Sequence, residues 1–280
     1  MKISVIGGAG KMGLCISKIL HKQGLDSMVW DKDGQRLLKA REQGIKIAES
    51  CEDAVKKADV IVVSVPIRNF EEAVKEVSRY LRKDQLLIDI SSVKEYTVKI
   101  MHKHIHTATT IGAHPMFGPS TDNLQDQNIV LTPTTREEVR IAKNIKDNLD
   151  TMGAKTTIMT SREHDQLIIA ALALPHLIAL ATAETLLRTD RERLRHVAGP
   201  SLKTLMSLVN NVISEDPELY CSIQMNLRSG NTLRQFQRST EEWIQIMESK
   251  DAGRFAERMK LLNQKLGQKF SEKRDGPRET

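Results

Sequence analysis

The fold is decided by residues 1–31, which read MKISVIGGAGKMGLCISKILHKQGLDSMVWD. The apolar run at residues 3–6 is typical of a buried strand, and the glycine-rich motif Gly8-Ala9-Gly10-Lys11-Met12-Gly13 follows it. Apolar residues then recur at helical spacing, and a second apolar run ends in Asp31. This order of strand, turn, helix and strand is the one that a dinucleotide-binding fingerprint requires. A glycine-rich turn without a ligand is the alternative interpretation.

Each glycine of the motif has a predicted physical role. Gly8 lets the chain turn sharply, Gly10 leaves room for a pyrophosphate, and Gly13 lets the helix pack close to the strand. The free N–H groups and the positive end of the helix dipole then hold the phosphates. Asp31 follows Gly13 at close to the ~20-residue distance expected of the acid that binds the ribose. Because its carboxylate repels a 2′-phosphate, we expect NAD to be preferred, with NADP possible because Lys32 is adjacent.

The composition is that of an ordinary globular protein. Hydrophobic residues make up 40% of the 280 residues and charged residues 28%, and the net charge is +6. This basic excess is mild, and no basic run interleaved with aromatic residues predicts nucleic-acid binding. An anionic small-molecule substrate accounts for it equally well.

The cysteines and apolar segments predict a cytoplasmic protein. Cys15, Cys51 and Cys221 lie far apart and form no C-x-x-C motif, so we expect neither disulfides nor a metal site. The N-terminus is predicted to be a strand rather than a signal peptide. The apolar run at 167–183, which contains Pro175 and His176, is predicted to be a buried helix rather than a membrane span.

Strand and helix patterns alternate up to about residue 160. Strands are predicted at 3–6, 28–30, 58–66, 86–90, 109–113, 129–132 and 155–159, and helices at 36–43, 70–81 and 136–149. Such alternation is typical of a parallel sheet with right-handed crossovers. We therefore predict an α/β fold, with a Rossmann-type, doubly wound, mostly parallel sheet in residues 1–160. An all-α domain for substrate binding and dimerisation at 161–270 and a disordered tail at 271–280 complete the prediction.

The carboxyl ends of the strands are where a doubly wound sheet binds its ligands. There the sequence places Ser92 after one strand and His114 after the next, in a turn expected to be fixed by Pro115. An imidazole beside a nicotinamide suits a general base that takes the proton of a substrate hydroxyl. A structural turn residue is the alternative for His114. The predicted cofactor-binding residues are Gly8, Gly10, Lys11, Met12, Gly13, Asp31, Ser64, Val65 and Pro66.

Several motifs in one order resemble a known family. They are the N-terminal glycine motif, Ser92-Val93-Lys94, His114-Pro115-Met116-Phe117-Gly118-Pro119, Val130-Leu131-Thr132-Pro133 and Leu174-Pro175-His176. Together they resemble prephenate dehydrogenase and its arogenate-using relatives. The resemblance implies NAD-dependent oxidative decarboxylation of prephenate to 4-hydroxyphenylpyruvate, in the biosynthesis of the aromatic amino acid tyrosine.

The resemblance also implies residue roles. His114 matches the family's catalytic histidine, Ser92 a serine that contacts the substrate hydroxyl and that histidine, and His176 a substrate-facing histidine. The chain departs from the family near Ser207, where an arginine that grips a substrate carboxylate is often found. The remaining candidates for this charge are Lys203, Arg228 and Arg234.

Three other interpretations stay open at this point. The substrate could be arogenate, or the chain could be another dehydrogenase or reductase of the hydroxyacid superfamily. A nucleotide-sensing binding protein without catalysis is the non-enzyme alternative, which an intact His114 and Ser92 argue against. Apolar surplus on the helices at 165–188 and 200–213 predicts a homodimer.

Overall fold

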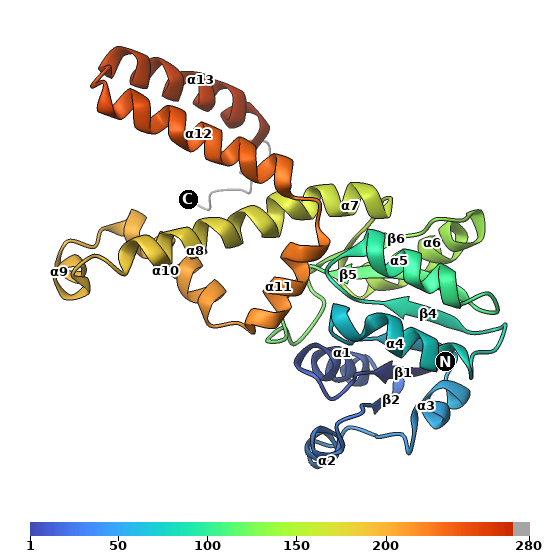
Figure 1. The fold of residues 1–280 in the computed structure, drawn as a ribbon. Helices are drawn as coiled ribbons and strands as arrows, with labels where there is room; N and C mark the ends of the chain where they lie inside the picture. The colour runs from blue at the N-terminus through green and yellow to red at the C-terminus, as the bar shows by residue number, and fades with distance from the viewer. Residues whose placement is uncertain (271–280) are drawn as a thin grey trace, which may run out of the picture. The chain divides into compact units, whose positions relative to one another are not determined.

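The computed structural model describes residues 1–270, and the tail predicted at 271–280 lies outside the described residues. One sheet dominates the N-terminal part (Figure 1), in the order β2-β1-β3-β4-β5-β6-β7. Its strands are β1 (Lys2–Ile6), β2 (Asp26–Trp30), β3 (Val60–Val63), β4 (Leu86–Asp89), β5 (Thr109–Pro115), β6 (Asn128–Thr132) and β7 (Lys155–Ile158). All seven predicted strands are present, so the Rossmann-type prediction is confirmed.

Two strands, β6 and β7, run against the other five. β6 pairs antiparallel with β5, whereas every other neighbouring pair in the sheet is parallel. The segment between β5 and β6 contains no helix, so the chain reverses beside the strand it has just left instead of crossing over the sheet. The crossover rule that holds from β1 to β5 therefore fails at this step, which makes the sheet mostly rather than wholly parallel.

Helices cover both faces of the sheet. They are α1 (Lys11–Lys22), α2 (Gly34–Glu42), α3 (Cys51–Lys57), α4 (Ile67–Ser78), α5 (Lys94–His104) and α6 (Arg136–Thr151). One hydrophobic cluster joins the sheet to α3, α4 and α5, and a second joins it to α1 and α6. The predicted helices at 36–43, 70–81 and 136–149 correspond to α2, α4 and α6. The short helix α3 and the helix α5 were not predicted.

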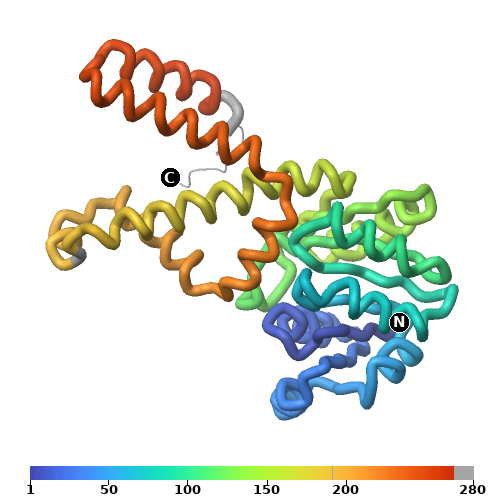
Figure 2. The backbone as a smooth tube through the Cα atoms, in the orientation of Figure 1, coloured from blue at the N-terminus to red at the C-terminus, as the bar shows by residue number. Residues whose placement is uncertain are grey.

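A long helical segment follows the sheet. It consists of α7 (Ser161–Ile168), a π-helical turn η1 (Ile169–Ala173) and α8 (Leu174–Leu186), which the backbone tube in Figure 2 follows as one rod. Pro175 cannot donate a backbone hydrogen bond and crowds the preceding turn, and the π turn just before it relieves that conflict. Three shorter helices come next: α9 (Arg191–His196), α10 (Pro200–Ile213) and α11 (Pro217–Asn226).

The helical segment is attached to the sheet by one hydrophobic cluster. Ile67 of α4 and Val93 before α5 pack there with Ile168 of α7, Ala173 of η1 and Ile223 of α11. The attachment matters for function, because it brings α7, α8 and α11 to the carboxyl ends of β4 and β5.

The described residues form two compact units, 1–228 and 229–270. In the second, α12 (Gly230–Glu248) and α13 (Ala252–Phe270) form a helical pair. Trp243 packs edge-to-face on Phe255 and lies 4.7 Å from the guanidinium of Arg258, which also pairs with Glu242 at 2.6 Å. The domain boundary expected near residue 160 stays a prediction, because helical packing onto the sheet continues through residue 228.

The helix Ser161–Leu186 is less buried than expected. By length and composition alone it could cross a membrane, and only 28% of its most apolar stretch is buried inside the structure. Leu167 and Leu180 are both exposed. The prediction of a buried helix at 167–183 is therefore wrong for this chain taken alone, and the described residues leave apolar surface uncovered here.

Candidate active site

The glycine-rich turn between β1 and α1 is built by close backbone approach. The sharp turn falls on Gly7, whose φ is +74°, rather than on Gly8 as the sequence had suggested. A Cβ on Gly13 would lie 2.6 Å from the carbonyl oxygen of Gly7 and from the Cα of Gly8. A side chain at Gly13 would therefore push α1 away from the turn, which agrees with the role predicted for this glycine.

The residues around this turn fit a bound dinucleotide. A Cβ on Gly10 would meet the oxygen of Gly7 at 3.3 Å and nothing closer among the described residues, so a phosphate can approach the backbone there. The first turn of α1 carries no acidic residue, and Gly10 offers no side-chain cap. The first N–H groups of α1, which include those of Lys11 and Met12, are therefore free to bind an anion.

Asp31, Ser64 and Val65 converge on the same turn. The buried carboxylate of Asp31 accepts hydrogen bonds from the backbone N–H groups of Ala9 (3.3 Å) and Asp33 (3.0 Å). The Ser64 carbonyl oxygen would lie 2.4 Å from a Cβ on Gly7. Pro66 follows as the N-cap of α4. The structure thus brings the predicted cofactor residues together at the carboxyl ends of β1, β2 and β3.

His114 lies within β5, not in a turn after a strand. It pairs with Val130 of the antiparallel strand β6, and its side chain is 5% exposed. Burial, then the Lys94 ammonium group, then His164 hold the pKa of His114 well below its ordinary value of 6.5. The ring is therefore neutral at neutral pH and able to accept a proton.

Two residues of α7 support His114, one by direct contact and one through the first, and the sequence did not single out either of them. Nδ1 of His114 lies 2.8 Å from Nε2 of His164, and Nδ1 of His164 lies 2.7 Å from Oδ1 of Asp165. The Asp165 carboxylate also accepts the backbone N–H groups of Lys94 (2.8 Å) and Glu95 (2.9 Å) at the start of α5. All of these side chains except that of Glu95 are buried.

Lys94 belongs to the motif Ser92-Val93-Lys94, but the sequence predicted no role for it. Its fully buried ammonium group donates to the Asp89 carboxylate and, at 2.6 Å, to the carbonyl oxygen of Ala113, the residue before His114. Burial lowers the pKa of Lys94, while the charge of Asp89 opposes that shift. The ion pair links the carboxyl ends of β4 and β5 under the predicted base.

The side-chain hydrogen bond that the structure records for His114 is with His164, so an orienting role for Ser92 stays a prediction. The Ser92 side chain is half-buried just before α5, and the structure records no hydrogen bond from its hydroxyl to another described residue. The neighbouring Ser91 instead donates to Asp89 Oδ1 at 2.6 Å. Contact of Ser92 with a substrate hydroxyl remains a prediction.

His176 is buried at the start of α8. Its ring packs edge-to-face on Tyr220, with centroids 3.9 Å apart, and its Nδ1 lies 3.3 Å from Nε2 of Gln224. Burial lowers the pKa of His176. Tyr220 packs against the same hydrophobic cluster as Met116, which follows His114 by two residues. The two predicted histidines therefore belong to one region of the fold.

The three predicted carboxylate-binding cations are more scattered. Lys203 on α10 and Arg228 after α11 are exposed in the first unit, and the structure records no hydrogen bond or ion pair between either of them and His114 or His176. Arg234 belongs to the second unit, where its guanidinium lies 3.5 Å from Oδ1 of Asn231. None of them is brought into the histidine network by the described contacts.

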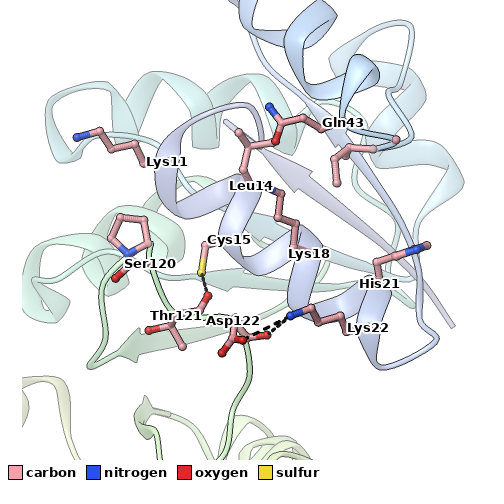
Figure 3. Close-up of a pocket in the computed structure, with 13 residues that line it drawn as sticks. Lys11, Leu14, Cys15, Lys18, His21, Lys22, Gln43, Ser120, Thr121 and Asp122 are labelled. Carbon is pink, nitrogen blue, oxygen red and sulfur yellow. Dashed lines mark hydrogen bonds and ion pairs between the residues drawn. The ribbon is translucent and has the colours of Figure 1, made fainter.

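A separate pocket of about 730 Å³ lies over α1 (Figure 3). Its walls come from α1, from residues 43–45 and from residues 119–122, and of the predicted cofactor residues it includes only Lys11. Lys22 donates to the Asp122 carbonyl oxygen at 3.0 Å, and the Cys15 thiol to that of Thr121 at 3.1 Å. Within residues 1–270, no three His, Cys, Asp or Glu side chains gather in a way that could hold a metal.

The fold and the site together define a class. This class is the dinucleotide-dependent oxidoreductases. Its features here are a Rossmann-type sheet with a phosphate-accepting glycine turn and a buried neutral imidazole on another strand of that sheet. The chain matches the family models described as "Prephenate dehydrogenase, nucleotide-binding domain" over residues 16–158 and "Prephenate dehydrogenase, dimerization domain" over residues 160–261. It belongs to the prephenate dehydrogenase family.

Relatives in sequence agree with this assignment. The chain is 31% identical over 273 residues to a probable arogenate/prephenate dehydrogenase of Methanocaldococcus jannaschii, covering 95% of this chain and 61% of that protein. It is 26% identical over 269 residues to the T-protein of Enterobacter agglomerans, covering 95% of this chain and 67% of that protein. The chain thus spans about two thirds or less of the length of these relatives.

Solved structures agree in fold. A crystal structure of prephenate dehydrogenase from A. aeolicus, in complex with hydroxyphenyl propionate and NAD+, matches with a TM-score of 0.77 at 22% identity. The match covers 96% of this chain and 98% of that one. Synechocystis arogenate dehydrogenase matches with a TM-score of 0.75 at 17% identity, over 96% and 99% of the two chains.

The buried ion pair under the site makes a testable contribution to stability. We expect Lys94→Met to lower the free energy of unfolding by about 3–5 kcal/mol, because it leaves the Asp89 carboxylate buried without its cation. Urea unfolding followed by circular dichroism measures the change. Lys57→Met is the matched control, since it removes an exposed lysine from its pair with the half-buried Asp53 (2.6 Å) and should change stability little. Equal losses in the two variants would contradict the role given to Lys94.

Proposed function

We propose that this protein catalyses the NAD-dependent oxidative decarboxylation of prephenate to 4-hydroxyphenylpyruvate. The observation that carries the proposal is the buried, neutral His114, held on β5 in the same sheet whose β1 and β2 flank the glycine-rich turn. Membership of the prephenate dehydrogenase family supports the substrate class. Arogenate is the alternative substrate, because the cationic residues that are candidates for binding a substrate carboxylate do not distinguish it from prephenate.

His114 serves as the proton acceptor in this reaction. The bound nicotinamide supplies a hydride acceptor for the ring carbon that carries the substrate hydroxyl. As the hydride leaves, the hydroxyl proton moves to Nε2 of His114, the nitrogen not engaged by His164. When the carbon–carboxylate bond breaks, its electron pair enters the ring, and the oxygen takes the same proton back as the ring becomes aromatic. No net proton is consumed or released.

The helical segment binds the rest of the substrate. We place His176 against the substrate as a binding residue, with Ser92 near the reacting hydroxyl. Lys203, Arg228 and Arg234 are the candidates for a substrate carboxylate, since Ser207 occupies the place where relatives often carry an arginine. Contributions from a second subunit fit this arrangement. We further propose a cytoplasmic location.

Turnover and its dependence on His114 test the proposal. Purified protein with NAD and prephenate should produce NADH absorbance and 4-hydroxyphenylpyruvate, and His114→Asn should lower kcat by roughly 10²–10⁴ because asparagine cannot take a proton. Since only neutral His114 accepts the proton and its pKa is depressed, kcat/KM should stay level down to pH 6.5 and fall only at more acidic pH.

His176→Asn is the companion variant for that assay. It should raise the substrate KM more than it lowers kcat, because its proposed role is binding. The proposal fails if neither prephenate nor arogenate is turned over. NAD binding without any turnover would favour a nucleotide-sensing protein.

Cofactor choice should depend on Asp31. We expect Asp31→Ser to raise the ratio of kcat/KM with NADP to that with NAD, because the carboxylate no longer repels a 2′-phosphate and the exposed Lys32 is unopposed. Steady-state kinetics with both cofactors measure the ratio. Asp33→Ser is the matched control, since it removes the same charge two residues away and keeps a residue able to cap α2. A wild-type enzyme whose kcat/KM with NADP equals that with NAD would contradict the assignment of Asp31 as the residue that binds the ribose.

We also propose that the chain works as a homodimer through its helical segment. Leu180, Leu187 and Ile213 are exposed there, and residues 160–261 match the family's dimerization domain. Light scattering at micromolar concentration should give about twice the chain mass of 31.6 kDa. A monomer mass would contradict the proposal.

A further inference from the structure

The contacts around His114 determine which of its nitrogens carries hydrogen. The Asp165 carboxylate can only accept, so Nδ1 of His164, 2.7 Å away, must carry a hydrogen. In the neutral ring the other nitrogen, Nε2, is then an acceptor. Nε2 of His164 lies 2.8 Å from Nδ1 of His114, so that Nδ1 carries a hydrogen in turn. Nε2 of His114 is left as the unprotonated atom.

Asp165 is fixed in the accepting state by the start of α5. Its Oδ1 accepts the N–H of Lys94 at 2.8 Å and its Oδ2 accepts the N–H of Glu95 at 2.9 Å. These are two of the free N–H groups of a helix N-terminus, which favour a negative charge. The carboxylate is 6% exposed, so water does not compete for these bonds. The orientation of His164 is thereby set by the backbone of a neighbouring helix.

We propose that His164 and Asp165 are positioning residues, which hold His114 as the Nδ1–H tautomer and stabilise the cation formed when its Nε2 takes up the substrate proton. The proton uptake rests on the proposed function, whereas the tautomer does not. No proton needs to move along the chain: the Nδ1–H of His114 stays bonded to His164 while Nε2 gains the substrate hydroxyl proton and later returns it.

The electrostatics of the site make this support necessary. A proton on His114 creates a positive charge in a buried position, beside the Lys94 ammonium group. The charge of Lys94 is balanced by its own partner, Asp89. His164 lies between Asp165 and His114. The Asp165 carboxylate therefore supplies the opposing negative charge across one imidazole ring. The arrangement follows the logic of a catalytic triad with a second histidine between base and acid.

The tautomer can be read directly in the wild-type protein. We would label the histidines with ¹⁵N and record long-range ¹H–¹⁵N correlations, and assign His114 by its loss in His114→Asn. The expected result is a protonated Nδ1 and an unprotonated Nε2 on His114. A protonated Nε2 overturns the proposal. This readout needs no substrate, so a protein that fails to turn over prephenate removes the proposed function but leaves this test intact.

Kinetics of Asp165→Asn test the catalytic consequence. An asparagine offers one acceptor and one donor where the site requires two acceptors, so it should lower kcat by roughly 10²–10³ and change the substrate KM and the NAD affinity by less than about threefold. The nitrogen signals of His114 should shift toward the other tautomer. Asp150→Asn is the matched control, because Asp150 Oδ1 also accepts a backbone N–H, that of Thr156, at 3.0 Å, but outside this network.

The control should keep its kcat and its His114 signals even if its melting temperature falls. If Asp165→Asn keeps wild-type kcat and tautomer, Asp165 is only structural and the proposal is wrong. If the variant does not fold, the wild-type spectrum alone decides.

Discussion

The structure depends on one buried charge, the ammonium group of Lys94. It joins Asp89 at the end of β4 to the carbonyl oxygen of Ala113 in β5, and the backbone N–H of the same residue holds Asp165 of α7. A buried cation is tolerated only when it is paired and hydrogen-bonded, so two strands and two helices must meet in one geometry. Gly112 leaves room in this region, since a Cβ there would meet Thr132 and Val98 first and would lie 3.3 Å from Lys94 Cδ.

The local part of this architecture could be predicted from the sequence. Strands, the glycine turn and the helix after it are set by neighbours within a few residues, through apolar periodicity and through glycines that allow close approach. The motif around His114 likewise gave the predicted base, although β5 extends through Pro115 and carries His114 inside a strand. What was wrong there was the boundary, because the antiparallel partner β6 prolongs a strand that the proline had been expected to end.

The remaining part depends on contacts that no local pattern records. His164 and Asp165 lie 50 and 71 residues from the groups they bind, His114 and the Lys94 N–H, and look in the sequence like polar residues of an ordinary helix start. The helix α5 was also not predicted, because it buries Lys94 and Thr97 on a face where apolar residues would be expected. Likewise, the apolar residues at 167–183 predicted burial, yet only 28% of the most apolar stretch of this helix is buried in the single chain.

The two histidines of the site offer opposite polarity to a ligand. Nε2 of the Gln224 amide can only donate, so Nδ1 of His176 accepts and its hydrogen lies on Nε2. His176 therefore presents a donor, whereas His114 presents an acceptor. A substrate with a hydroxyl at one end and an anionic or carbonyl oxygen at the other satisfies both, whereas the reversed molecule leaves the His114 acceptor without a donor. Because His114 is fixed by the buried His164 and His176 by the half-buried Gln224, this polarity belongs to the fold. With both histidines against the substrate, as proposed, it would orient the substrate before any cationic side chain contributes.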